Sequence, residues 1–217
     1  MLSLMTALLV LPSIAASGDL GPGETNLIPN GDFSQGNTGF TSDLPYTKPA
    51  FNCLWPGAYT IAPTFNKPLL HQLIAPDPFP ALVKATGKEN VFYANAGGVE
   101  PLMVWSTKVK CQPDTRYLIS FNSVSLSGYI EEGYPPHQVA TEEWVPEFEL
   151  WANNQPSAPY KAGRGVFNKI RMIWKSRKAT EATIKIVRTR IAHGGGLIGI
   201  SDIQMVPLAP SATADLN

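Results

Sequence analysis

The sequence has little cysteine, little histidine and few charged residues. Two of its 217 residues are cysteine, three are histidine and 16% carry a charge. Lysine plus arginine equals aspartate plus glutamate at 17 each, so the formal net charge is zero. Without a basic excess, the chain has no general means of neutralising the phosphates of a nucleic acid or of attaching to an anionic membrane surface. We therefore expect no nucleic acid among its partners.

Catalytic motifs are missing as well. The sequence contains no HExxH, GxSxG or P-loop spacing, and its histidines join no local Ser/His/Asp pattern. Those histidines are His71, His137 and His193. The adjacent glutamates Glu131-Glu132 and Glu142-Glu143 could supply the paired carboxylates of a glycosidase, but such pairs in a polar loop usually form a solvated rim. We therefore predict that the chain is not an enzyme.

A helical apolar period of useful length is also absent, whereas proline and glycine are abundant, at 20 and 18 residues. This composition favours short strands joined by turns. Apolar residues alternate with polar ones in a series of runs, as expected of half-buried strands. The runs are 26–28, 57–62, 91–94, 102–109, 116–123, 148–151, 166–173, 182–189 and 197–206. Their spacing predicts one all-β domain over 26–208, folded as an antiparallel β-sandwich in which 166–173 pairs with 182–189.

The two ends of the chain differ from this domain. Residues 1–16 carry no charge, include an apolar run too short to span a membrane, and close with small residues, which is typical of a secretory signal peptide. The basic residues usual in such a signal are absent, and a disordered or strand-forming N-terminus is the alternative. We predict a flexible lead over 17–25 and a disordered tail over 209–217. The mature chain is then secreted or held at the cell surface, with no membrane span.

The two cysteines are Cys53 and Cys111. In an exported chain they could form one disulfide, which would stabilise the fold by about 2–4 kcal/mol. Two separate free thiols are the alternative. The spacing has no CxxC character, so neither a zinc site nor a redox motif is indicated.

Several motifs occur in the order found in one known family. The run 26–37 (NLIPNGDFSQGN) resembles the opening strand of galactose-binding-like jelly rolls, which include many carbohydrate-binding modules of bacterial secreted proteins. Their closing strand often carries Asp-Ile or Asp-Val, matched here by Asp202-Ile203. Between these ends, 104–106 with 113–117, then 174–176 and 183–187, resemble the family's middle strands. The resemblance covers about residues 26–206 and implies a jelly-roll sandwich that binds glycans, although the same scaffold also serves adhesion.

The resemblance also implies a structural calcium ion between the opening and closing strands. The matching residues are Asp32, Ser34 and Asp202. Calcium takes six to eight oxygen ligands, so two carboxylates helped by backbone carbonyls could hold it. Many relatives carry glutamate where this chain has Ser34, which removes one charged ligand. The alternative is that Asp32 forms an Asx turn and Asp202 faces solvent.

Aromatic side chains are the best candidates for a sugar site, because the C–H faces of a pyranose stack on indole and phenol rings. The long polar segment 129–146 interrupts the strand rhythm, as functional loops do. The available rings are Trp55, Tyr59, Tyr129, Tyr134, Trp144, Trp151 and Tyr160, whereas Trp105 and Trp174 are expected in the core. Trp144 lies in the loop, and Trp151 alternates with the apolar face of its strand. The predicted ligand-binding residues are Tyr129, Tyr134, Trp144, Trp151 and Arg164.

Two functions remain open from the sequence. The first is non-catalytic binding of a glycan through these loop aromatics. The alternative is a structural or adhesive surface protein that binds protein partners or further copies of itself. Loss of sugar binding in Trp144→Ala and Trp151→Ala variants would favour the first, and concentration-dependent self-association without a glycan signal would favour the second.

Overall fold

The computed structural model describes residues 25–50, 53–63, 90–96, 100–125, 145–164, 167–190 and 196–209. None of these residues lies in a helix, so no helix among them is long and apolar enough to cross a membrane. The predicted signal peptide over 1–16, the lead up to residue 24 and the tail from residue 210 lie outside the described residues. Those predictions therefore stay untested.

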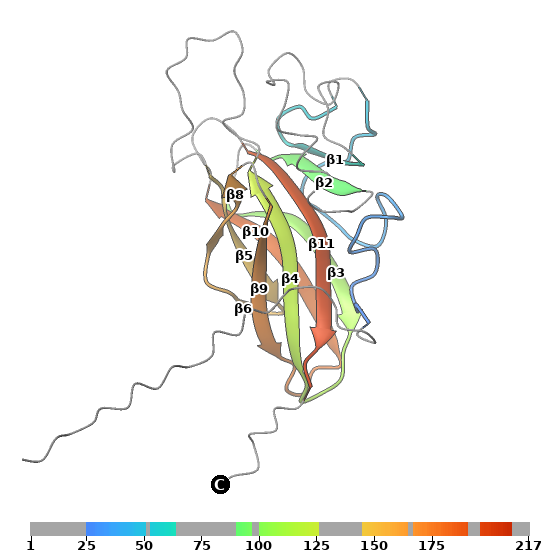
Figure 1. The fold of residues 1–217 in the computed structure, drawn as a ribbon, viewed down its shortest axis with the longest axis vertical. Coiled ribbons are helices and arrows are strands. Elements are labelled where there is room, and N and C mark those ends of the chain that lie inside the picture. Colours follow the sequence, from blue (N-terminus) through green and yellow to red (C-terminus); the bar gives the residue numbers. More distant parts are fainter. Residues whose placement is uncertain are drawn as a thin grey trace, which may run out of the picture.

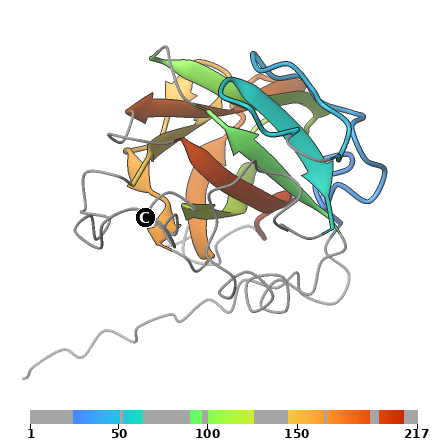
Figure 2. The same ribbon diagram turned by 90° about the horizontal axis from the view of Figure 1, so that it is seen from above.

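The described strands form two sheets that pack face to face (Figures 1 and 2). The β11 sheet consists of β1 (Ala58–Ala62), β2 (Val91–Asn95), β11 (Leu197–Pro207) and β4 (Arg116–Ser125), with β8 (Gly163–Arg164) and β9 (Asn168–Lys175) both paired to β4. The β10 sheet consists of β3 (Leu102–Lys110), β10 (Glu181–Arg190) and β5 (Glu147–Ala152), with β6 (Gln155–Pro156) and β7 (Tyr160–Lys161) paired to β5. Apart from the short parallel contact of β8 with β4, these pairings are antiparallel. The predicted all-β antiparallel sandwich is confirmed.

Period-two alternation decides which side chains enter the core. In β10, Ala182, Ile184 and Ile186 are fully buried while the residues between them are partly exposed. Facing them across the sandwich are the inward side chains of the β11 sheet, such as Ile119 and Phe121 of β4. Burying such a side chain contributes about 1.5–3 kcal/mol, so these strands are held mainly by their inner faces. The two tryptophans expected in the core, Trp105 and Trp174, are buried there.

One predicted strand pairing is wrong. β9 and β10 follow each other in the chain but do not pair: β9 pairs with β4 in the β11 sheet, and β10 pairs with β3 and β5 in the β10 sheet. The connection between them crosses from one layer to the other. Both strands carry an apolar stripe, and that stripe is buried when the strands face each other across the core just as well as when they lie side by side.

The segment 25–50 covers the edge strands on one side of the sandwich (Figure 1). Thr41 forms a bridge with Ser106 of β3, the edge of the β10 sheet, and Tyr46 forms one with Tyr59 of β1, the edge of the β11 sheet. Exposed strand edges offer unpaired backbone groups to other chains. This segment satisfies part of both edges from within the chain.

The opening motif lies against β11 without forming the predicted strand over 26–28. The side-chain amide of Asn26 adds to the backbone hydrogen bond from Leu27 N–H to the carbonyl of Met205: its Nδ2 donates to the carbonyl of Ile203 at 2.9 Å, and its Oδ1 accepts from the backbone N–H of Met205 at 2.9 Å. Gly31 then approaches β11 so closely that a Cβ atom there would lie 2.0 Å from the carbonyl oxygen of Ile203. The Asn-Leu-Ile…Asn-Gly pattern thus anchors the start of the domain to its last strand.

Candidate functional site

Four of the five predicted ligand-binding residues cannot be placed by their side chains. Tyr129, Tyr134 and Trp144 lie outside the described residues, and of Arg164 only the backbone, in β8, is described. Trp151 lies in β5 with its ring on the outer face of the β10 sheet, half-buried as the alternation predicts. Its indole Nε1 donates to Glu149 Oε2 at 2.9 Å. Whether these five residues form one site therefore remains a prediction.

The most exposed aromatic side chains among the described residues lie elsewhere. Trp55 is 47% exposed and Tyr46 is 37% exposed, although both belong to segments that also bury core residues. Trp55 is one of the rings available from the sequence but is not among the predicted ligand-binding residues. The sequence did indicate that Trp55 is exposed, because the Pro56-Gly57 pair that follows it is typical of a turn, and turns lie at the surface.

Trp55 lies on a turn, residues 53–57, that hydrogen bonds hold from both sides; we call it the Trp55 turn. The N–H of Gly57 donates to the carbonyl of Asn95 at 2.7 Å, and Asn95 Nδ2 donates back to the carbonyl of Leu54 at 3.2 Å. On the other side, Thr47 Oγ1 donates to the carbonyl of Cys53 at 2.8 Å. Gly57 has a φ of +86°, a conformation that favours glycine. The backbone that carries the exposed indole is therefore held in place before any ligand arrives.

Tyr46 is positioned by a column of rings that rises from the core. Tyr59 stacks on the fully buried Phe92 with ring centroids 4.7 Å apart, and Tyr46 packs on Tyr59 at 5.5 Å. The hydroxyl of Tyr59 donates to Asn37 Oδ1 at 2.7 Å. Burial raises the pKa of Tyr59 above its usual value; the hydrogen bond to Asn37 opposes this shift, and the neighbouring Tyr46 adds to it. Tyr59 therefore stays a neutral donor near pH 7, and the column ends in the exposed ring of Tyr46.

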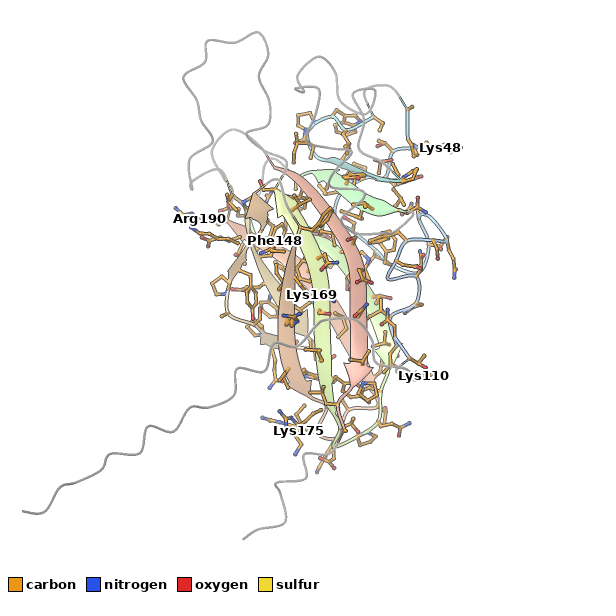
Figure 3. All side chains as sticks on the ribbon, viewed as in Figure 1. Lys48, Lys110, Phe148, Lys169, Lys175 and Arg190 are labelled. Atoms are coloured by element: carbon orange, nitrogen blue, oxygen red, sulfur yellow. The ribbon has the colours of Figure 1, made fainter. Side chains whose placement is uncertain are left out.

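The chemistry available at this place is stacking and hydrogen bonding. Thr47 joins the two aromatic segments, since its hydroxyl binds the Trp55 turn and its backbone N–H donates to the carbonyl of Tyr59 at 2.8 Å. The neighbouring Lys48 is exposed and lies at the outer end of the molecule in Figure 3. Two ring faces and a nearby ammonium group suit a ligand with both C–H faces and hydroxyl groups.

The residues predicted to hold calcium are engaged by donors of the chain itself. Asp32 Oδ1 accepts from the backbone N–H and the hydroxyl of Ser34, at 3.1 and 2.9 Å, which is the Asx turn foreseen as the alternative. Asp202 does not face solvent: it is buried, it accepts from Gln204 Nε2 at 2.9 Å, and it lies 3.9 Å from the ammonium group of Lys169. No group of three or more acidic, histidine or cysteine side chains that could hold a metal is found among the described residues. As they lie, these side chains do not fit a calcium cage, and calcium binding stays an untested prediction.

Cys53 and Cys111 are both buried free thiols, so the structure contains no disulfide between them. Cys53 belongs to the Trp55 turn, whereas Cys111 lies at the opposite end of the sandwich, where its N–H donates to the carbonyl of Thr180. A disulfide needs Cα atoms within about 7 Å, which positions at opposite ends of the strands do not allow. The alternative of two separate thiols is the one observed.

Comparison with known proteins adds no family assignment. No protein-family model and no curated protein matches the sequence. Similar solved structures include a family 16 carbohydrate-binding module, 12% identical with a TM-score of 0.46, matched over 83% of this chain and 99% of that chain. A second is TmCBM61 in complex with β-1,4-galactotriose, 13% identical with a TM-score of 0.49, over 85% and 99% of the two chains.

A third is the enzymatically active domain of tailspike protein 4 of bacteriophage CBA120, 12% identical with a TM-score of 0.48. This match covers 84% of the present chain but only 21% of the tailspike chain. Two of these three proteins are carbohydrate-binding modules, the class of domain that the sequence resembles. At such identities and TM-scores these similarities carry no argument about the present chain.

Proposed function

We propose that this chain is a non-catalytic, exported module that binds a glycan, and that the Trp55 turn and Tyr46 form its aromatic contact surface. The observation that carries the proposal is the exposed indole of Trp55 on a turn that backbone and side-chain hydrogen bonds hold from two sides. A large ring exposed to water costs free energy in a monomer, and a rigid position reduces the entropy lost when a ligand stacks on it. Both features favour a binding surface over a structural role.

The other parts of the proposal rest on the sequence. Export rests on the predicted signal peptide over 1–16, and the non-catalytic assignment rests on the missing catalytic motifs. Trp144 and Trp151, predicted from the sequence, stay in the proposal as a second aromatic surface. The resemblance of the motifs in 26–37 and 201–203 to carbohydrate-binding modules supports a glycan as the ligand.

A glycan array read with single alanine variants tests the proposal. Trp55→Ala and Tyr46→Ala should each weaken binding of the captured glycan by about tenfold or more, which is the effect of losing an anchoring aromatic contact. Read on uncharged glycans, Ile173→Ala is the matched control, because it removes an exposed apolar side chain from the opposite end of the molecule. Trp144→Ala and Trp151→Ala measure the sequence-predicted surface in the same assay.

Each outcome decides one part. Loss in Trp55→Ala with unchanged binding in Ile173→Ala supports the Trp55 turn as the site. Loss confined to Trp144→Ala and Trp151→Ala would move the site to the sequence-predicted surface. Absence of any glycan signal, with self-association that grows with concentration, would replace glycan binding by the adhesive function. Release of shortened sugar from a bound glycan would contradict the non-catalytic assignment.

A further inference from the structure

The charge of this neutral chain is unevenly distributed over its surface. On the outer face of the β10 sheet, cations lie beside acids: Lys108 pairs with Glu181 at 3.8 Å and Arg190 with Glu147 at 3.7 Å. At one end of the β11 sheet exposed cations gather instead. We call this cluster the basic end; its members are Arg116, Lys175, Arg177 and Lys178.

The strand register explains why these cations lie together. Arg116 of β4 is directly opposite Lys175 of β9, and the next pair inward, Tyr117 and Trp174, points into the core. Because neighbouring residues on a strand point to opposite faces, Arg116 and Lys175 share the outer face. The turn that follows β9 adds two more exposed cations, Arg177 and Lys178, beside this pair. Figure 3 shows Lys175 at the end of the molecule opposite to Lys48.

Few carboxylates balance this cluster. Asp114 is exposed in the facing turn, and Glu181 at the same end is paired with Lys108. Within the described ranges, neither Asp114 nor any other carboxylate forms an ion pair with a member of the basic end. Four cations against the single carboxylate of Asp114 leave a local excess of three positive charges.

The cluster costs the folded chain stability and is nevertheless held firmly. Like charges directly opposite each other in a sheet are destabilising, and Arg116 and Lys175 are such a pair. The turn that carries the other two cations is fixed: Ser176 Oγ donates to the carbonyl of Gln112 at 2.7 Å, and the N–H of Asp114 donates to the carbonyl of Arg177. The repulsion therefore cannot be relieved by movement of the backbone. A bound anion would relieve it.

The surface beside the cations is extended and partly apolar. Ile173, two residues before Lys175 on the same face, is 56% exposed, the highest value among the large apolar side chains that the structure describes. No exposed aromatic ring of the described residues lies at this end, so the stacking platform on which single-stranded nucleic acids depend is missing. A linear polymer with repeated negative charges and apolar ring faces fits this surface better than bases do.

We propose that the basic end binds an acidic polysaccharide, a glycan whose carboxylate or sulfate groups repeat along its chain. This surface is separate from the Trp55 turn. Asn95, which holds that turn, pairs with Leu197 at the first residue of β11, whereas Arg116 adjoins Tyr117, which pairs with Pro207 at the last. At about 3.3 Å per residue the two surfaces lie roughly 30 Å apart. The inference goes beyond the proposed function and does not require it.

Retention on immobilised heparin, which is sulfated, and on polygalacturonate, which is carboxylated, tests the proposal. The full chain should be retained at about 50 mM salt, and its affinity should fall steeply as salt rises. The triple variant Lys175→Gln, Arg177→Gln and Lys178→Gln should bind at least about tenfold more weakly, because the three substitutions remove a large fraction of the electrostatic attraction. The control triple variant Lys48→Gln, Lys185→Gln and Arg190→Gln removes the same charge away from the basic end and should stay within about twofold of the parent.

The melting temperature of each variant distinguishes a loss of binding from a loss of folding. Lys175→Gln alone removes the repulsion with Arg116, so the melting temperature of the free chain should rise while retention weakens. No retention on either polymer, equal loss in both triple variants, or a lowered melting temperature in Lys175→Gln would overturn the proposal. Equal binding to single-stranded DNA or to phosphatidylserine vesicles would overturn it as well. Trp55→Ala should leave retention on both polymers unchanged, so this proposal and the proposed function fail independently.

Discussion

Gly31 shows how one residue can fix the start of a domain to its end. It lies against β11, where the N–H of Ile203 donates to the carbonyl of Gly31 at 2.9 Å. Gly31→Ala would place a Cβ atom 2.0 Å from the carbonyl oxygen of Ile203, so the backbone must shift. We expect a loss of about 3 kcal/mol in the free energy of unfolding, measured by urea denaturation.

Gly36 supplies the control for this prediction. It has a φ of +65°, and a Cβ atom at this position would have no atom within 4 Å. Gly36→Ala therefore introduces backbone strain alone, which costs about 1 kcal/mol. Equal losses in the two variants would show that close packing against β11 is not what requires glycine at position 31.

The cysteine and tyrosine environments predict weaker stability in alkali. Burial raises the pKa of the Cys111 thiol, and the carboxylate of Glu181 raises it further; burial also raises the pKa of Tyr59. The unfolded chain therefore loses these protons at lower pH than the folded chain does. The stability that the protonated thiol contributes is complete below the ordinary thiol pKa of about 8.5 and is lost as the pH rises above it.

Urea denaturation at a series of pH values checks this prediction. The free energy of unfolding should fall between about pH 8 and 10, and Cys111→Ala should make the fall shallower. Thiol titration in denaturant should find both cysteines reactive, as expected of free thiols. A chain without reactive thiols after unfolding would restore the disulfide.

Lys169 and Asp202 predict how the chain responds to calcium. Their side chains are only 16% and 12% exposed, so each charge is stabilised by the other. With an ammonium group beside Asp202, a chelator should leave the melting temperature unchanged, whereas Lys169→Met should lower the free energy of unfolding by about 1–3 kcal/mol. A melting temperature that rises with millimolar calcium and falls with chelator would instead establish the calcium site implied by the resemblance, because a ligand of the folded state stabilises it.

At the scale of elements, two turns lock one end of the sandwich. Ser176 is buried between the turn after β9 and the turn before β4; its Oγ accepts from the N–H of Thr115 at 3.0 Å and donates to the carbonyl of Gln112 at 2.7 Å. Ser176→Ala leaves these backbone groups without their partner, so we expect a loss of about 1–3 kcal/mol in urea denaturation. The exposed Ser34, whose hydroxyl binds Asp32, is the control, and Ser34→Ala should cost less than about 0.5 kcal/mol. Similar costs in both variants would contradict the lock.

Sequence alternation predicted the strands far better than it predicted their partners. The eight longer strands fall within a few residues of the predicted runs, because the side chains that enter the core repeat every second residue. The pairing of β9 with β10 was wrong, since an apolar stripe does not record whether it meets its neighbour edge to edge or across the core. The two-residue strands β6, β7 and β8 were missed because a run that short has no period.

At the scale of the whole molecule, the two proposed surfaces should behave as independent sites. The Trp55 turn and the basic end lie at opposite ends of β11 and share no contact among the described residues. A variant that combines Trp55→Ala with Lys175→Gln should show the sum of the two single changes in the free energy of unfolding, to within about 0.5 kcal/mol. Urea denaturation of the four chains measures this sum. A larger deviation would indicate that the two ends are coupled through the core.

The charge of the molecule illustrates why composition alone was an incomplete guide. A net charge of zero correctly describes the chain as a whole. The register of β4 with β9 nevertheless gathers Arg116 and Lys175, while on the other face Lys108 and Arg190 each pair with an acid. Net charge carries no information about where the charged side chains lie, so only the fold could reveal a local excess of positive charge.

The sequence by itself determined the class of fold, the inward faces of the long strands and the core positions of Trp105 and Trp174, because these follow from local alternation of apolar and polar residues. The tertiary structure decided what depends on residues far apart in the chain. It separated Cys53 from Cys111, placed Lys169 beside Asp202, and left Trp55 exposed on a turn held by Asn95. Each of these results depends on which strands became neighbours, and hydrophobic periodicity does not specify neighbours.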